Sequence, residues 1–376
     1  MNDEHEPIFL GLITDEEIES FKKSVGQKKH PLKTLLAAYE GYLESLKRGP
    51  ADLRTIVMLN TARAVKAIDL RFDPWLQNLK KRILDVSDPT NASSAFGEIR
   101  ALGSVVHMRL RTDVVTPQTQ QGGRPEFVLH HGDQKVVIEV HTKQSDPRET
   151  ERMERELREQ KEENLKKARP ITTANGRQVT VTTAATIVSP LGAPTSGKAG
   201  DFYITNEISR IASIKQRGHQ VVEGVPFVLW LDFQEPDVWL FPQQEHYCQP
   251  IFGGEHGRVK SGFIWWALYG EKDDSIVHFE NYTRLTPMAH PGKFAQDKRI
   301  SAIVVSLSNT TLVFEHPDPS VRMPAWLRHR LFLLPQIEMD NSWLELAPGM
   351  VSNAVQAAKK RVALLGQLAA DLENHV

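Results

Sequence analysis

Two glutamates on neighbouring predicted strands have the residue type and spacing for metal chemistry. Glu126 lies in the short segment Arg124–Leu129, and Glu139 lies in the β-branched run Val136–Lys143. Residues 130–133, between these runs, contain a Gly and an Asp, which favour a tight turn. The two runs are therefore predicted to pair as a β-hairpin that brings the two carboxylates together.

Side-chain alternation along the second strand adds two basic residues to this pair. Glu139, His141 and Lys143 share one face, because successive side chains in a strand point to opposite faces. Glu126 occupies the matching face of the partner strand. Carboxylates repel when they are brought together, so such a pair favours a divalent cation between them. The cofactor that this arrangement predicts is Mg²⁺ or Mn²⁺.

A helix before the hairpin and a helix after it carry two further candidate site residues. Ala95–Leu102 reads as a helix bearing Glu98, and Val105–Arg111 reads as the strand that follows it. Later in the chain, Asn206–Gln216 reads as a helix bearing Lys215. We expect Glu98 to join the metal site, where it could position a second ion or orient a ligand of the first.

These elements together resemble the PD-(D/E)XK phosphodiesterase superfamily, which has the restriction-endonuclease-like fold. In that family a helix supplies a first acid, one strand a second acid, and the next strand the acid and Lys of the (D/E)XK signature. Here Pro125-Glu126 stands where Pro-Asp would be, and Glu139-Val140-His141 stands where Glu-x-Lys would be. The resemblance covers residues 91–235 and implies an α/β protein with a mixed β-sheet core flanked by helices.

The sequence departs from the family signature at two positions. Glu126 in place of Asp keeps a metal-binding carboxylate, whereas His141 in place of Lys removes a permanent cation. Relatives are known to move this Lys to another element, so the resemblance implies that Lys143 or Lys215 replaces it. His141 could itself accept a proton from the attacking water, because an unperturbed imidazole has a pKa of about 6.5.

The resemblance implies a metal-dependent nuclease that hydrolyses DNA phosphodiester bonds, of the restriction or phage-defence kind. Cutting both strands of a duplex requires two sites, so a homodimer is expected. A second hypothesis, favoured by His141, is a catalytically degenerate nuclease fold that acts as a DNA- or protein-binding module. A third is an unrelated small-molecule enzyme or nucleotide-binding protein that uses Gly192–Lys198. This segment has the spacing of a P-loop, although Ala199 lacks the hydroxyl that would hold magnesium.

Charge and composition limit the partners and the compartment. The chain has 376 residues and a net charge of −1, so any DNA contact must come from a local basic patch. Its single cysteine, Cys248, excludes an internal disulfide framework and a Cys-rich zinc site. No signal peptide is recognisable, and no segment approaches the roughly 18 apolar residues that a membrane helix needs. We therefore expect a cytoplasmic protein that does not contact membranes.

The chain divides into three regions. Residues 1–90 read as an N-terminal helical region, residues 91–335 as the core with a β-rich extension, and residues 336–376 as a helical tail. A charged, exposed helix is expected at 147–169, and the terminal helix, 348–374, either closes the domain or forms a dimer contact. In the extension, strands are expected at 226–233, 237–241, 262–269, 275–279, 300–307 and 310–315.

Overall fold

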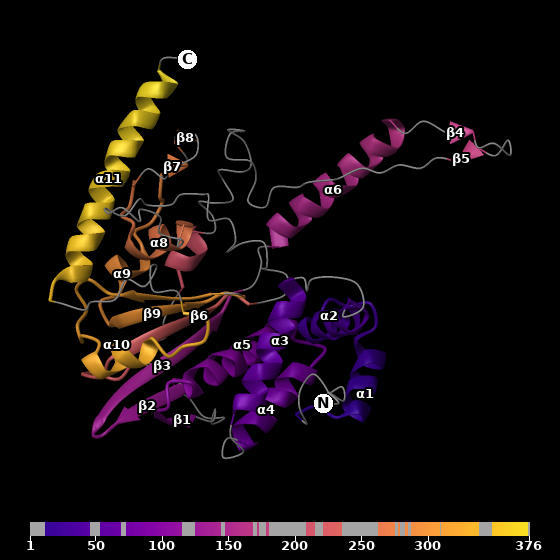
Figure 1. Ribbon diagram of the computed structural model, residues 1–376, viewed down its shortest axis with the longest axis horizontal. Helices are drawn as coiled ribbons and strands as arrows, with labels where there is room; N and C mark the ends of the chain where they lie inside the picture. The colour runs from indigo at the N-terminus through magenta and orange to yellow at the C-terminus, as the bar shows by residue number, and fades with distance from the viewer. Residues whose placement is uncertain are drawn as a thin grey trace.

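A six-stranded mixed sheet forms the centre of the protein in a computed structural model (Figure 1). The structure describes residues 12–45, 53–68, 73–114, 125–143, 147–167, 171–172, 178–179, 208–214, 221–234, 262–274, 277–278, 283–284, 287–308, 310–337 and 348–374. In spatial order the strands of the sheet are β1 (Arg111–Val114), β2 (Phe127–His131), β3 (Gln134–Thr142), β6 (Phe227–Asp232), β9 (Ile300–Ser306) and β10 (Thr311–Glu315). Strands β3, β6 and β9 run parallel, whereas the outer pairs are antiparallel. The protein therefore belongs to the α/β class, as predicted.

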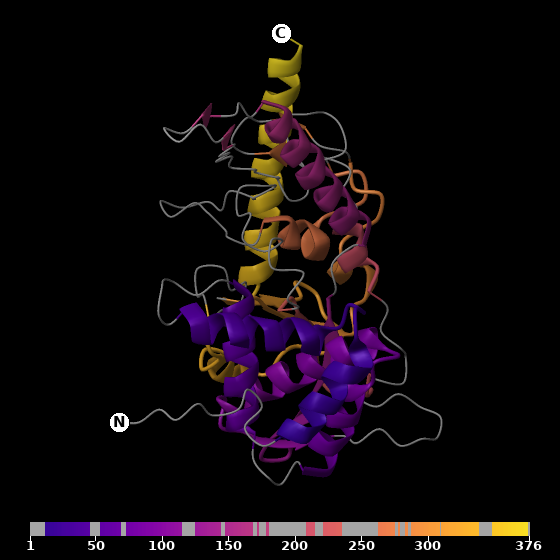
Figure 2. The same cartoon turned by 90° about the vertical axis from the view of Figure 1, so that its right-hand side faces the viewer.

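Helices cover both faces of this sheet (Figures 1 and 2). One face carries the N-terminal helices, α1 (Asp15–Val25), α2 (Pro31–Ser45), α3 (Leu53–Ala67), α4 (Asp73–Leu84) and α5 (Pro89–Val106), with α10 (Ala325–Leu331) beside them. The other face carries α8 (Gly262–Tyr269), α9 (Lys293–Gln296) and α11 (Met350–Glu373). The two-stranded pairs are β4 (Ile171–Thr172) with β5 (Gln178–Val179), and β7 (Val277–His278) with β8 (Thr283–Arg284).

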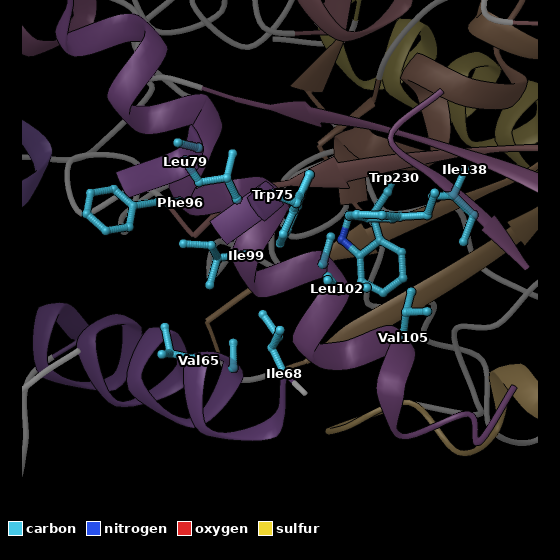
Figure 3. Close-up of a cluster of buried hydrophobic side chains, with 14 of the residues drawn as sticks. Val65, Ile68, Trp75, Leu79, Phe96, Ile99, Leu102, Val105, Ile138 and Trp230 are labelled. Carbon is cyan, nitrogen blue, oxygen red and sulfur yellow. The ribbon is translucent and has the colours of Figure 1, made fainter. Parts of the chain in front are cut away.

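The N-terminal helices share one hydrophobic core with the sheet. Trp230 of β6 and Ile138 of β3 point toward Leu102 and Val105 of α5 (Figure 3). Side chains of α3 and α4 complete the same cluster, and Trp75 of α4 lies edge-on to Phe127 of β2, with ring centroids 5.8 Å apart. Helices α1–α4 are thus packed against the core and cover this face.

A long charged helix, α6 (Pro147–Lys167), extends away from the sheet with β4 and β5 at its far end (Figure 1). The charged helix expected at 147–169 is thereby confirmed. No helix in the described part of the chain is long and apolar enough to cross a membrane.

Helix α5 lies directly on the sheet, and two of its glycines permit this close approach. A Cβ atom at Gly97 would overlap Oγ1 of Thr142 and would lie 3.2 Å from Oδ2 of Asp232. A Cβ atom at Gly103 would lie 2.5 Å from Cα of Ala64 on α3. Any larger residue at position 103 must therefore push the two helices apart.

Gly103→Ala is expected to lower the free energy of unfolding by about 1–3 kcal/mol, the usual cost of overpacking a core. The gain in helix propensity, about 1 kcal/mol, does not offset the backbone displacement. Gly41→Ala on α2 is the matched control, because nothing lies within 4 Å of its added Cβ, and it should leave the protein equally or more stable. Urea unfolding of both variants measures the difference, and equal midpoints would contradict the close α3–α5 contact.

The structure confirms several predicted strands and corrects two. The β2–β3 hairpin, β6, β9 and β10 lie where the sequence predicts them. The strand expected at 105–111 is wrong: α5 continues to Val106, and β1 begins only at Arg111. The strand expected at 262–269 is also wrong and forms helix α8. Its residues are apolar on every side, and such a short run fits a buried strand and a buried helix equally well. Residues 237–241 lie outside the described part, and within 275–279 only β7 is described.

Candidate active site

The predicted hairpin forms and places Glu126 at its open end. Phe127 pairs with Ile138, and the strands are joined by a turn in which Gly132 has φ +58°. Such a left-handed conformation favours glycine, so this residue fixes the register of the hairpin. Glu126 immediately precedes β2, next to the part of β3 that contains Glu139.

A backbone group of β3 holds the Glu126 carboxylate. The N–H groups of Val137 and Lys143 donate toward β6, to the carbonyls of Pro226 and Asp232. Backbone N–H groups alternate between the two edges of a strand, so the N–H of Val140 points away from β6, toward the segment that precedes β2. There it donates to Oε2 of Glu126 at 3.0 Å. The carboxylate therefore takes the place that a strand carbonyl would occupy in a longer ladder.

Glu126 lies within electrostatic range of two other glutamates, Glu98 of α5 and Glu139 of β3. The pKa of Glu126 is raised well above its usual value, first by burial and then by the negative charges of Glu98 and Glu139. Glu98 is buried on α5, and Glu139 is buried on β3. The convergence of Glu126 and Glu139 that the sequence predicts therefore agrees with the electrostatics of the folded chain.

Arg82 of α4 binds Glu98 with two hydrogen bonds, an interaction that the sequence did not predict. Its Nη1 and Nη2 atoms donate to the two carboxylate oxygens at 3.0 and 2.8 Å. Burial raises the pKa of Glu98 in spite of this guanidinium. Since both oxygens accept from Arg82, the geometry favours a positioning role for Glu98 over that of a direct metal ligand.

Lys293 lies within electrostatic range of Glu139 and, together with Lys143, within range of His141. Lys143, next to the end of β3, and Lys293 of α9 are both buried. Lys293 donates a hydrogen bond to the backbone carbonyl of Ile214. Burial lowers the pKa of Lys293, while the charges of Asp297 and Glu139 act in the opposite direction. Lys293 comes more than a hundred residues after the hairpin, and no local pattern in the sequence connects it to this site.

His141 has a lower pKa than the sequence led us to expect. Desolvation by the surrounding protein, and then the positive charges of Lys143 and Lys293, lower this pKa from 6.5 to about 4. The side chain nevertheless keeps an exposed surface. His141 is therefore uncharged at neutral pH and a weaker base than an unperturbed imidazole. It can still accept a hydrogen bond from a water molecule.

The described residues permit a two-carboxylate site for magnesium but do not form a larger ligand cage. Among them, no group of three or more His, Cys, Asp or Glu side chains is placed to hold a metal ion. Mg²⁺ commonly binds through one or two carboxylates and keeps several of its waters. Glu126 and Glu139 suit such a site in donor chemistry and charge. Lys215 and the P-loop-like segment Gly192–Lys198 lie outside the described residues.

Glu126→Gln is expected to stabilise the folded protein at neutral pH. The carboxyl of Glu126 has a raised pKa when folded, so its ionisation opposes folding once the pH exceeds the unfolded value of about 4.3. Glutamine keeps the oxygen that accepts from Val140 and removes the charge. The gain, on the order of 1 kcal/mol for each unit of pKa shift, should disappear below pH 4. Thermal unfolding of both proteins at pH 7.5 and at pH 4 measures it, and an equal or lower melting temperature at pH 7.5 would contradict this account.

Comparisons with known proteins do not identify a family for this chain. No protein-family model matches it, and no solved structure matches it significantly. One curated protein, probable ubiquitin carboxyl-terminal hydrolase 9 of Schizosaccharomyces pombe, is 24% identical over 123 residues, which is 32% of this chain. The aligned part spans only 21% of that protein. This partial likeness says nothing about the glutamate cluster.

Proposed function

We propose that this protein is a metal-dependent nuclease that hydrolyses DNA phosphodiester bonds on a restriction-endonuclease-like core. The single observation that carries the proposal is that Glu126, immediately before β2, lies within electrostatic range of Glu139 on β3 and of Glu98 on α5. A buried carboxyl whose pKa is raised by burial and by neighbouring carboxylates is a liability for stability and is typical of functional sites. A divalent cation would remove that repulsion.

The order of elements also supports this proposal. Helix α5 with Glu98 is followed by β1 and by the β2–β3 hairpin with Glu126 and Glu139. A helical segment at 208–212 then precedes β6, which pairs in parallel with β3. The PD-(D/E)XK superfamily, which the sequence resembles, presents its helix acid, strand acid and signature strand in this order.

Each site residue has a defined part in the proposed reaction. Glu126 and Glu139 would hold Mg²⁺ or Mn²⁺, which when bound supplies a hydrated Lewis acid next to the phosphate. Lys143 and Lys293 neutralise charge that develops on the phosphate oxygens as water attacks phosphorus and the bond to the leaving oxygen breaks. His141, uncharged, accepts a hydrogen bond from the attacking water and orients it. The proton of that water passes to solvent, and the leaving alkoxide oxygen takes a proton from solvent.

A degenerate nuclease fold that binds DNA or protein without cutting is the alternative. The observation that favours it is His141, which stands at the signature Lys position with a pKa of about 4. The two functions differ in DNA cleavage, because a binding module retards DNA in a gel but does not cut it.

Incubation of the purified chain with supercoiled plasmid DNA tests the proposal. Nicked or linear product is expected with Mg²⁺ or Mn²⁺ and should be absent with a chelator. If cleavage requires two copies acting on opposite strands, linear product should increase with protein concentration, and light scattering should detect a homodimer. Intact plasmid under all metal conditions, together with retarded DNA, would overturn the nuclease in favour of the binding module.

A further inference from the structure

A polar cavity lies on the opposite face of the sheet from Glu139, between the carboxyl ends of β6 and β9 and helices α3 and α5. Its volume is about 110 Å³. In α/β sheets, the carboxyl ends of parallel strands are where ligands commonly bind. The side chains that carry the following inference are Asn60, Arg63, Arg100, His107, Gln234 and Ser306.

A hydrogen-bond network fixes the orientation of the amides in this cavity. Asn60 donates through Nδ2 to the backbone carbonyl of Ser308 at 2.8 Å and to Oε1 of Gln234 at 2.7 Å. A carbonyl can only accept, so the Asn60 amide must point its nitrogen this way, and Gln234 must present its oxygen to Asn60. Gln234 then donates through Nε2 to Oγ of Ser306 at 2.6 Å. The hydroxyl hydrogen of Ser306 is therefore directed to another acceptor.

The cavity wall contains cations and donors but no carboxylate. Arg63 and His107 are exposed at its rim on α3 and at the end of α5. Arg100 is buried in the wall, where Asp232, which does not line the cavity, accepts from its Nη2 at 2.5 Å. The carbonyls of the last turn of α5 accept from the following backbone N–H groups, including that of His107. The helix end therefore presents little uncompensated negative charge to the cavity.

We propose that this cavity binds one small oxyanion, a phosphate group or an anion of its size, held by Arg63 and the Gln234–Ser306 pair. The volume accommodates several waters, each occupying about 30 Å³ in the liquid, or one tetrahedral anion. It is smaller than the roughly 300–1,000 Å³ of pockets that enclose whole small-molecule ligands. This site is separate from the proposed nuclease site, because none of Glu98, Glu126 and Glu139 lines the cavity.

Calorimetric titration of the full chain with inorganic phosphate tests the site. Arg63→Ala should weaken phosphate binding about tenfold or more, as expected for loss of one hydrogen bond to a charged group. Gln234→Glu is the sharper variant. Glutamate can still accept from Asn60 and can accept from the Ser306 hydroxyl, so the network survives while a negative charge enters the cavity. It should abolish detectable phosphate binding.

Lys66→Ala is the matched control, because Lys66 is an exposed cation on α3 that does not line the cavity. Its phosphate affinity should equal that of the unmodified chain. Competition by oligonucleotides with a 5′-phosphate, but not with a 5′-hydroxyl, would assign the anion to a nucleic-acid end. Failure of both to compete would assign it to a free small molecule. No phosphate binding at millimolar concentration, or equal binding by Gln234→Glu, would overturn the site.

Discussion

Glu139→Gln is expected to lower the rate of Mg²⁺-dependent DNA cleavage by about a thousandfold. A catalytic metal stabilises the transition state by several kcal/mol, and each 1.4 kcal/mol or so corresponds to a factor of ten in rate. Glu139 is buried on β3, so the isosteric glutamine removes the charge and keeps the packing. Cleavage of supercoiled plasmid under single-turnover conditions measures the effect.

Three measurements separate this loss from a loss of folding. The melting temperature of Glu139→Gln should not fall below that of the unmodified chain, because repulsion with Glu126 is relieved. Its affinity for DNA in the absence of metal should also be kept. Asp113→Asn, a carboxylate on β1 that is half exposed, is the matched control and should cleave normally. Full activity of Glu139→Gln, or equal inactivity of Asp113→Asn, would remove the glutamate pair from the reaction.

The hairpin at the centre of the site could be predicted because its signals are local. Alternating apolar side chains set the faces of β2 and β3, and Gly132 supplies the turn conformation that the register requires. The same alternation placed Glu139 and Lys143 on one face. The detail that sequence reasoning missed is the Val140 N–H, which fixes Glu126 only because β2 starts one residue later.

Long-range partners could not be predicted in the same way. Arg82 and Lys293 reach the site from α4 and α9, and neither carries a motif that distinguishes it from the other basic residues of the chain. Their burial follows from how whole layers pack, which a single sequence does not specify. The wrong prediction of a strand at 262–269, which forms α8, has a related cause. A run that is apolar on every side has no periodicity that distinguishes a buried helix from a buried strand. The lowered pKa of His141 likewise results from burial and then from the charges of Lys143 and Lys293, so it could not be inferred from β3 alone.

The cation that replaces the signature lysine is expected to be Lys143, with Lys293 in support. Lys143 lies on the strand face of Glu139, so Lys143→Met should lower the cleavage rate about a hundredfold, as is usual for loss of a group that stabilises charge in the transition state. Lys293 already donates to the carbonyl of Ile214, so Lys293→Met should lower the rate about tenfold. Lys135→Met, exposed near the start of the same strand, should have no effect.

Mg²⁺ affinity and melting temperature distinguish a catalytic role of Lys143 and Lys293 from a structural one. If Lys143 and Lys293 act on the phosphate, Mg²⁺ affinity and melting temperature should be nearly unchanged while the single-turnover rate falls, and Lys143→Arg should recover part of it because the charge is kept. Substitution of Lys293 should also raise the pKa of His141, since one of the nearby positive charges that lower it is removed, and NMR titration of the imidazole detects this shift. If both methionine variants cleave normally while Lys215→Met does not, the replacement cation is Lys215, and Lys143 and Lys293 serve only to set the charge around Glu139 and His141.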